Sequence, residues 1–560
     1  MNPRAGVLFA AGALLAGTVT ALPASASPAP RPPTTPADRS AGAPEAGPTT
    51  RPAAPLIWKS CGSKRYPRLE CGTLKVPLDH DDPKSRTISL ALSRVPHTAR
   101  TSQGPLLVNP GGPGGSGLSM AGFVAASLPP KLAAQYDVIG FDPRGVGRSE
   151  PALNCRPGHF EPVRHDSVPR DAATESAGVE RARAFAAACG AKYGDLLRHI
   201  DTVSAARDLD AIRRALGAER VNYFGYSYGT YLGAVYAKLY PERVRRFVLD
   251  SMVDPEGVWY RDNLAQDFAF DTRHKAFMAW VAEHDTAYGL GADPAAVEAA
   301  WYRMRDELRT APAGDKVGPA ELEDTYLPGG YYNGYWPQLA EAFAAYVKEE
   351  DTALLIAAYE DLGASDASSD NGYSVYAAVQ CRDAAWPRDW RVWRADNWVA
   401  QLKAPFSTWN NAWYNAPCAF WPVEPRTPVD VTNDKVPPML LFQATDDAAT
   451  PYEGGVSLHR AVGGSRLVVE EGGGNHAVTL GGNACLDAHL VRYLESGTVP
   501  RAAAGTGEAD AACAAAPAPK PAAKKTATSR AVPAPAPAPA TETETATGGA
   551  ALHRLLGHRG

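Results

Sequence analysis

The sequence has no excess of positive charge. Its 560 residues carry 56 Lys and Arg against 61 Asp and Glu, a formal net charge of −5. Nucleic acids and anionic membrane surfaces are bound by clustered positive charge. We therefore expect neither as a partner. With 45% hydrophobic and 21% charged residues, most of the chain has the composition of a folded soluble protein.

The beginning of the sequence has few charges and no apolar run of membrane-spanning length. The uncharged run from Ala5 to Val19 comes after the single cation Arg4. It is short for a bilayer core of about 30 Å, and Pro23 prevents a longer helix. Ala24-Ser25-Ala26 has the small-x-small form that a signal peptidase accepts. This pattern favours a cleaved export signal at 1–26 over a membrane anchor, and predicts a secreted protein.

Large apolar residues are scarce in two further segments. Pro, Ala and Thr dominate 27–55 and again most of 514–560. Such segments bury too little apolar surface to offset the entropy of ordering. We interpret the first as a linker or pro-segment. The second is a tail that is either trimmed or reaches through a cell wall, and the sequence leaves both open.

The spacing C-x-x-C does not occur among the eight cysteines, so a thiolate metal site is not expected. Export instead favours disulfides. Eight cysteines allow 105 pairings. We favour the scheme that pairs sequence neighbours, since each pair closes a local loop. The predicted pairs are Cys61 with Cys71, Cys155 with Cys189, Cys381 with Cys418, and Cys485 with Cys513.

Short apolar runs alternate with helical patterns through much of the chain, which predicts an α/β fold with a mostly parallel sheet. The alternation stops between about 255 and 430, where the sequence is helical and aromatic and holds most of the Trp residues. We interpret this stretch as an inserted helical cap. The expected organisation is 56–254 for the first part of the core, 255–430 for the cap and 431–513 for the second part of the core. The predicted strands lie at 106–108, 137–141, 221–224, 246–249, 439–442 and 466–469.

A candidate nucleophile lies in Gly225-Tyr226-Ser227-Tyr228-Gly229. The motif G-x-S-x-G alone is weak, but here a β-rich run leads into it and a helical run leads out. This is the sharp turn between strand and helix that exposes a nucleophilic serine. A serine hydroxyl also needs a histidine base and an acid that orients the base. Ser227 is therefore a nucleophile only if both are supplied elsewhere in the chain.

Two later loops can supply them. Asp447 lies after the apolar run that ends at Phe442, and His476 lies after the run that ends at Val469. Both positions lie just beyond the carboxyl end of a strand, where open α/β sheets place their sites. The order Ser, Asp, His matches an α/β-hydrolase. Asp250 is a competing acid, and a turn-forming Asp447 or an ordinary loop histidine is the alternative without chemistry.

A glycine-rich loop at 109–117 comes directly after the run 106–108. Its backbone N–H groups can approach a ligand closely, so we expect an oxyanion hole with one donor at Gly111 or Gly112 and the other at Tyr228. A phosphate-binding loop is the alternative, but the G-K-[ST] that it requires is missing.

Taken together, these motifs resemble the prolyl and tripeptidyl aminopeptidase family of α/β-hydrolases, and more closely the secreted streptomycete members with a carboxyl-terminal TAP-like segment. The resemblance covers about 58–513. It implies a serine exopeptidase with a helical cap, in which Ser227 is the nucleophile, Asp447 the acid and His476 the base. Asp446-Asp447-Ala448 stands where the family usually has Asp-Pro. The segments that carry the resemblance are 109–117, 142–149, 225–229, 447–451 and 475–476.

The resemblance implies peptide or protein amino termini as substrates, and no cofactor is expected. An aminopeptidase needs an anionic group for the substrate's ammonium, because an unpaired buried charge is costly. Our candidate is Asp383 in the cap, where a disulfide to Cys418 would fix the loop; a surface ion pair is the alternative. The aromatic cluster at 331–336 either lines the pocket or forms cap core. A small-molecule esterase, amidase or lactonase remains the second interpretation, and a non-catalytic binding protein the third.

Overall fold

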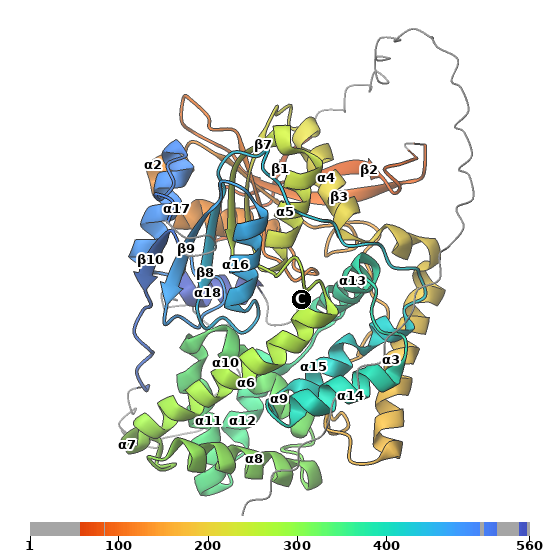
Figure 1. The fold of residues 1–560 in the computed structure, drawn as a ribbon, viewed down its shortest axis with the longest axis vertical. Coiled ribbons are helices and arrows are strands. Elements are labelled where there is room, and N and C mark those ends of the chain that lie inside the picture. The colour runs from red at the N-terminus through yellow and green to blue at the C-terminus, as the bar shows by residue number, and fades with distance from the viewer. Residues whose placement is uncertain (1–55, 83, 504–508, 523–547, 557–560) are drawn as a thin grey trace, which may run out of the picture. The chain divides into compact units, whose positions relative to one another are not determined.

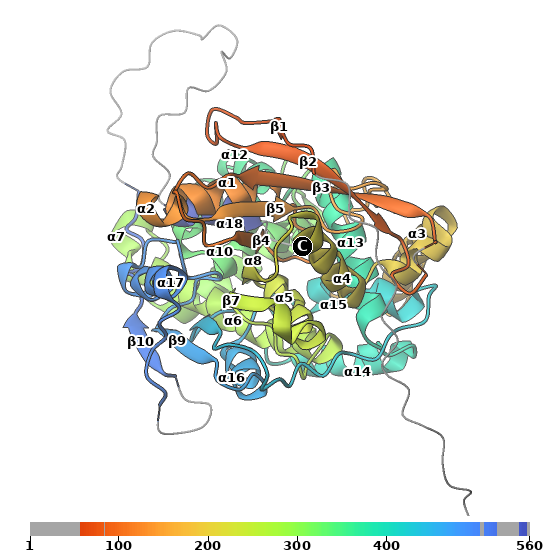
Figure 2. The same cartoon turned by 90° about the horizontal axis from the view of Figure 1, so that it is seen from above.

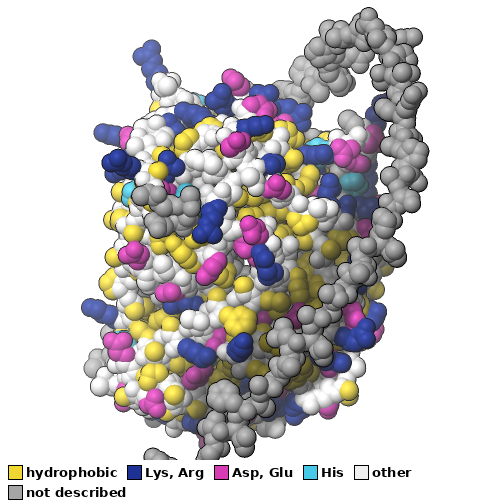
Figure 3. Space-filling view, in the orientation of Figure 1, with side chains coloured by type: hydrophobic (Ala, Val, Ile, Leu, Met, Phe, Trp, Pro, Cys, Tyr) yellow, Lys and Arg dark blue, Asp and Glu magenta, His cyan; other side chains and the backbone are white. Residues whose placement is uncertain are grey.

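The computed structural model describes residues 56–82, 84–503, 509–522 and 548–556 (Figure 1). The predicted signal peptide at 1–26 and the linker at 27–55 lie outside the described residues. None of the described helices is both long and apolar enough to cross a bilayer. On the face drawn in Figure 3, acidic and basic side chains are interspersed with apolar ones.

The strands of the described part form one sheet in the order β1-β2-β3-β5-β4-β6-β7-β8-β9-β10. Neighbours from β5 through β4 to β10 pair in parallel, whereas β1, β2 and β3 form an antiparallel edge. Figure 2 shows this edge on the side of the sheet opposite to β9 and β10. The strands are β1 (Lys59–Ser60), β2 (Glu70–Pro77), β3 (Thr87–Val95), β4 (Pro105–Asn109), β5 (Asp137–Phe141), β6 (Val221–Tyr226), β7 (Val244–Asp250), β8 (Leu440–Ala444), β9 (Arg466–Glu471) and β10 (Ala511–Ala514).

The central strands are apolar on both faces because helices cover both sides of the sheet. Successive side chains of a strand point to opposite faces. Leu106 and Val108 accordingly pack with α1 and α17, whereas Leu107 packs in the other cluster with α4 and α5. The helices outside the insertion are α1 (Leu118–Ser127), α2 (Pro130–Ala133), α3 (Ala172–Tyr193), η1 (Gly194–His199), α4 (Thr202–Ala215), α5 (Tyr228–Leu239), η2 (Pro241–Arg243), α16 (Tyr452–Ala461), α17 (Ala484–Ser496) and α18 (Gly548–Leu556).

A helical insertion separates β7 from β8 and lies at one end of the sheet (Figure 1). Part of it has its own apolar core, which contains Trp280, Trp301 and Trp336. We call this insertion the cap. Its helices are α6 (Tyr260–Glu283), α7 (Asp285–Tyr288), α8 (Pro294–Thr310), α9 (Pro319–Tyr326), α10 (Pro328–Tyr331), η3 (Asn333–Tyr335), α11 (Trp336–Glu349), α12 (Ala353–Ala358), η4 (Tyr359–Gly363), α13 (Ala367–Asp383), α14 (Trp390–Gln401), α15 (Thr408–Asn415) and η5 (Ala416–Phe420).

The sequence prediction of an α/β fold with a mostly parallel sheet is confirmed. All six predicted strands are present, as β4 to β9. The antiparallel edge, β10 and the long helix α3 were not predicted. α3 contacts η5 and α15, so a segment that precedes Ser227 in sequence packs against the cap.

The structure forms the four disulfides that the sequence suggested, Cys61–Cys71, Cys155–Cys189, Cys381–Cys418 and Cys485–Cys513. Cys155–Cys189 ties the loop after β5 to α3. Cys381–Cys418 joins α13 to η5 within the cap, and Cys485–Cys513 joins α17 to β10. Disulfides of this density are typical of proteins folded in an oxidising compartment.

Candidate active site

Ser227 occupies a strained turn between β6 and α5. Its φ is 54°, a left-handed conformation that is uncommon for a residue with a side chain. The two flanking glycines are required by packing: a Cβ at Gly225 would lie 2.5 Å from the carbonyl oxygen of Gly229, and a Cβ at Gly229 would lie 2.8 Å from Asn109 Oδ1. The turn presents Ser227 to a cavity under the cap.

His476 and Asp447 meet in the loops after β9 and β8. His476 Nδ1 lies 2.9 Å from Asp447 Oδ2, and the two side chains are 2% and 0% exposed. The Asp447 carboxylate also accepts the N–H groups of Ala449 and Thr450 at 2.9 and 3.0 Å. These donors fix the orientation of the carboxylate, which in turn holds the imidazole through Nδ1. Nε2 is thereby left as the ring nitrogen for proton transfer.

Asp250, the competing acid, has another role. Its backbone carbonyl accepts the N–H of Ser227 at 3.0 Å. Its carboxylate accepts the N–H groups of Val478 and Thr479 at 3.0 and 2.8 Å. Burial raises the pKa of Asp250 to about 6. The end of β7 therefore connects the nucleophile turn to the loop that carries His476.

The glycine-rich loop after β4 packs directly against the nucleophile. A Cβ at Gly111 would lie 2.8 Å from Ser227 Cβ and 3.2 Å from the backbone nitrogen of Tyr228. Gly111 and Gly112 both have left-handed φ values, 100° and 109°. The N–H of Gly111 donates to Asn109 Oδ1 at 3.0 Å, whereas Gly112 lines the cavity beside Ser227. Of the two candidates from the sequence, Gly112 is therefore better placed to pair with Tyr228.

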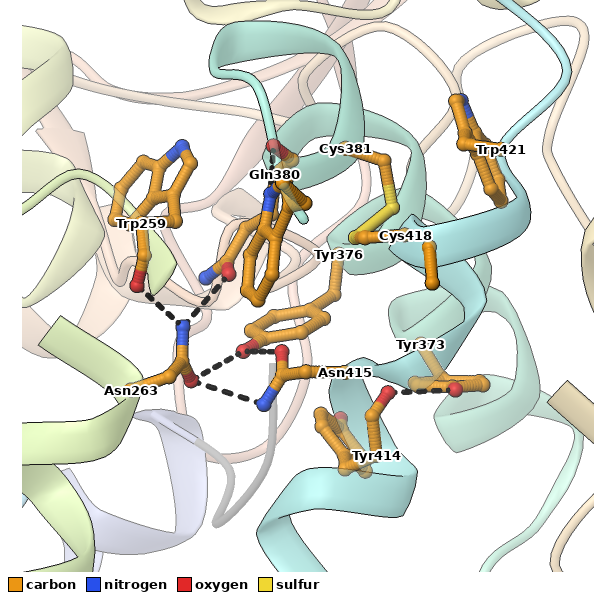
Figure 4. Close-up of a disulfide and its surroundings, with 12 residues drawn as sticks. Trp259, Asn263, Tyr373, Tyr376, Gln380, Cys381, Tyr414, Asn415, Cys418 and Trp421 are labelled. Carbon is orange, nitrogen blue, oxygen red and sulfur yellow. Dashed lines mark hydrogen bonds between the residues drawn. A yellow bond between two sulfur atoms is a disulfide. The ribbon is translucent and has the colours of Figure 1, made fainter. Parts of the chain in front are cut away.

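The cavity at Ser227 has a volume of about 330 Å³. Its floor comes from the sheet end and its roof from the cap. The disulfide Cys381–Cys418 lies behind its polar wall, where Asn263 donates to Gln380 Oε1 at 3.2 Å and Tyr376 donates to Asn415 Oδ1 at 2.9 Å (Figure 4). The apolar and aromatic lining consists of Val253, Trp259, Phe270, Leu327, Tyr331, Tyr376, Tyr414 and Ala449.

Part of the aromatic cluster at 331–336 lines the cavity, and part of it belongs to the apolar core of the cap. Tyr331 lines the cavity, and its carbonyl accepts the N–H of His476 at 2.8 Å. Tyr335 and Trp336 are buried in the apolar core of the cap. Asn333 N–H donates to Asn475 Oδ1 at 2.9 Å, so this cap segment also holds the loop of the histidine.

Asp383 does not line this cavity. Its carboxylate accepts the N–H of Thr202 at 2.8 Å and is bonded to the Thr202 hydroxyl, which also contacts the Tyr228 hydroxyl at 2.8 Å. Burial, together with the nearby Asp201 carboxylate, raises the pKa of Asp383 to about 7. The residue next to Cys381 that does line the cavity is Gln380. The structure therefore does not support Asp383 as a group for a substrate amine, because its carboxylate is hydrogen-bonded to Thr202 at the start of α4.

Three other carboxylates line the cavity with Ser227: Asp254, Asp262 and Glu453. Asp262 lies in the first turn of α6, and its Oδ2 is buried without a hydrogen-bond partner. Burial and then the charge of Asp254 raise the pKa of Asp262 to about 8. Sequence reasoning missed these residues, although Asp254 and Glu453 lie shortly after the ends of β7 and β8. The site thus combines a serine, a histidine–aspartate pair and an acidic wall.

One group of described residues has the spacing of a metal site, namely Cys485, His489 and Cys513. Its two sulfurs form the disulfide between α17 and β10, so they are not thiolate ligands.

Comparison with known proteins gives a consistent result. Residues 104–481 match the family model of the alpha/beta hydrolase fold. The tripeptidyl aminopeptidase of Streptomyces lividans is 44% identical over 456 residues, which cover 79% of this chain and 85% of that protein. The serine protease Hip1 of Mycobacterium tuberculosis is 33% identical, over 80% of this chain and 90% of its own. Carboxylesterase B of the same organism is 32% identical, over 89% and 97%.

Proposed function

Because the chain belongs to the α/β-hydrolase family and, within it, to the group of the streptomycete tripeptidyl aminopeptidases, we propose that it is a serine exopeptidase. It releases short peptides, of three residues by analogy with the relatives, from free amino termini through an acyl-enzyme on Ser227. The catalytic residues are Ser227, His476 and Asp447, and the oxyanion donors are the N–H groups of Tyr228 and Gly112.

The proposed reaction begins when His476 Nε2 takes the proton of Ser227 Oγ and this oxygen attacks the scissile carbonyl carbon. The carbonyl oxygen becomes negative and is held by the two N–H groups, each of which contributes about 10²–10³ in rate in related sites. Protonated His476 then gives its proton to the departing amine as the C–N bond breaks. Water, deprotonated by the same histidine, attacks the ester, and the peptide leaves as a carboxylate while Ser227 regains its proton.

The acidic wall is the observation that supports an exopeptidase rather than a general hydrolase. Asp262 and Asp254 lie together in the cavity with a buried carboxylate oxygen that has no partner. Burial, and after it the charge of Asp254, raise the pKa of Asp262 to about 8, so ionised Asp262 is poorly stabilised in the cavity even with Arg261 nearby. A substrate ammonium placed there would stabilise the ionised form of Asp262 and pair with it. The site therefore favours a free amino terminus within reach of Ser227.

A matched set of chromogenic substrates tests this proposal. It contains a tripeptide anilide with a free amine, its acetylated twin, single-residue anilides and a short acyl ester. We expect fast cleavage of the free tripeptide, slow cleavage of the acetylated twin, and loss of both in Ser227→Ala. Equal rates for the free and acetylated tripeptides would contradict the exopeptidase assignment.

A secreted esterase is the second candidate, favoured by the 32% identity to a carboxylesterase and by the aromatic lining of the cavity. It shares the triad and the oxyanion hole, so only the substrate distinguishes the two. Ester turnover far above that of every peptide anilide, with no effect of Asp262→Asn, would select it.

We also propose that the protein is exported. Four disulfides among the described residues support an oxidising compartment. Amino-terminal sequencing of the protein from culture medium tests this: cleavage after Ala26 is expected, and an intact Met1 in the cytoplasmic fraction would contradict it.

A further inference from the structure

The carboxyl-terminal helix α18 lies far in sequence from the catalytic loops but packs beside them. Ala551, Leu552 and Leu556 are buried in the apolar cluster that also contains Met120 of α1 and Ala477 of the histidine loop. The ring of His553 stacks on Tyr332 with 4.3 Å between centroids. α18 therefore contacts the helix after the glycine-rich loop and the cap segment that holds the loop of His476.

α18 also forms part of a second cavity, of about 400 Å³. Arg554, Leu555 and Leu556 line it on one side, and Gly114, Gly115 and Ser116 of the glycine-rich loop line it on another. Leu327 and Tyr414 line both this cavity and the one at Ser227, so the two cavities share walls. We call it the second cavity.

The position of the second cavity relative to Ser227 suggests its use: the first cavity is lined by Gly112 and the second by Gly114, Gly115 and Ser116 of the same loop. The acidic wall of the first cavity takes the amino terminus in the proposed function, and the scissile bond lies at Ser227. The substrate chain beyond that bond must then leave past the glycine-rich loop, where the second cavity begins. The charged side chains that line it are Asp324, Asp361 and the exposed Arg554 of α18.

We propose that α18 is a removable strap across the leaving-group side of the cleft, and that it restricts the enzyme to short peptides while it is docked. This inference rests on the proposed function, because it assigns the second cavity to the leaving part of the substrate. Docking is by apolar contact and by the stacked pair His553 and Tyr332. Residues 523–547 precede α18 in the sequence and include Lys524, Lys525 and Arg530, the residue types after which a trypsin-like protease cuts.

Two strap variants and one control test the proposal in the otherwise intact mature protein. The first variant ends at Ala522 and lacks the strap. The second keeps the full length and carries Leu552→Asp with Leu556→Asp, since a charge on the buried face opposes docking. The control ends at Leu556 and lacks only the last residues. The substrates are a free tripeptide anilide and a long peptide that begins with the same tripeptide.

We expect kcat/KM for the long peptide to rise about tenfold or more in both variants, while the anilide changes by less than about twofold and the control behaves as the wild type. A synthetic peptide of residues 548–556 added to the truncated protein should restore the restriction. An unchanged ratio of long peptide to anilide in both variants would overturn the strap.

A second readout separates the strap from the proposed function. Labelling of Ser227 by a compact and by a bulky fluorophosphonate requires the nucleophile but no peptide specificity. Faster labelling by the bulky probe alone, in both variants, would support the strap. If the same proteins cleave no peptide, the proposed function fails but the strap does not. Equal labelling of wild type and variants by both probes would contradict the strap.

Discussion

The backbone N–H of Ser227 donates to the carbonyl oxygen of Asp250 at 3.0 Å. The carboxylate of the same aspartate holds two N–H groups of the segment after His476. One buried residue at the end of β7 therefore sets the position of the nucleophile turn and of the loop that carries the base. Its acid group is used for positioning, while Asp447 contacts the imidazole.

Asp250→Asn should lower kcat for peptides and esters alike, by about tenfold or more, with little change in KM. An amide presents one acceptor oxygen where the carboxylate presents two, so the histidine loop loses one of its anchors. Steady-state kinetics with both substrate types check this. A selective effect on peptides alone would contradict a positioning role.

The same substitution should change how stability depends on pH. Burial raises the pKa of Asp250 from 3.8 to about 6 in the folded protein. A raised pKa contributes stability that is fully present below the unfolded value and is lost as the pH rises through the folded value. We therefore expect the wild type to lose stability relative to Asp250→Asn between about pH 4 and pH 7. Urea unfolding across this range measures it; parallel curves for the two proteins would contradict it.

Asp447→Asn should reduce kcat by about 10³- to 10⁴-fold, because the imidazole loses the partner that fixes its tautomer. Asp446→Asn is the matched control, since this neighbouring carboxylate is exposed. It should retain activity within a few fold. A severe loss in Asp446→Asn with little loss in Asp447→Asn would reassign the acid.

Asp262→Asn should raise KM for free-amine tripeptides by about tenfold or more and leave the ester unchanged, because only the former carries an ammonium. Glu256→Gln, an exposed carboxylate outside the cavity lining, is the control and should behave as the wild type. Equal effects of Asp262→Asn on both substrates would indicate a structural role instead.

The pH dependence of this preference has a definite sign. With the pKa of Asp262 raised to about 8, the carboxyl group of the empty site ionises as the pH rises toward that value. The ratio of kcat/KM for the free tripeptide to that for the ester should therefore increase from pH 6 toward pH 8. It should fall again above that, where the substrate amine, of pKa about 8, loses its proton. A flat ratio in the wild type would contradict the acidic wall as the amine site.

Removal of the disulfide behind the polar wall, by Cys381→Ser with Cys418→Ser, should destabilise the protein by about 2–5 kcal/mol. The cap helices α13 and η5 then lose their covalent link. The hydrogen bond between Asn263 and Gln380 in the cavity wall is then held less rigidly. We expect a lower midpoint of thermal unfolding and a higher KM for peptides. The pair Cys61 and Cys71, at the antiparallel edge of the sheet and outside the cavity lining, is the control: its removal should affect stability without a comparable change in KM.

The sequence predicted the parts of the fold that depend on local pattern. Buried parallel strands such as β6 and β8 are short apolar runs, and the turn at Ser227 has a motif of its own. The antiparallel edge was missed because β2 contains Glu70 and Lys75 and has a partly exposed face. β10 reads Ala-Ala-Cys-Ala and has little β propensity; pairing with β9 and the disulfide to Cys485 place it.

In the candidate site too, the sequence predicted the residues that depend on local pattern and missed those that depend on tertiary packing. Ser227, Asp447 and His476 lie just after strand ends, so topology alone brings them to one edge of the sheet. The proposed amine site depends on how the cap packs, which no local pattern encodes. Asp383 was chosen for the cysteine beside it, yet its carboxylate bonds to Thr202, whereas Asp262 enters the cavity from the first turn of α6.

The most direct test of exopeptidase activity is mass spectrometry of a long peptide with a free amino terminus, incubated with the wild type and with Ser227→Ala and stopped at early times. We expect successive loss of three residues from the amino terminus, a transient tripeptidyl adduct on Ser227, and no products with the variant. Internal cleavage, or an intact peptide under conditions in which a short acyl ester is hydrolysed at Ser227, would contradict it.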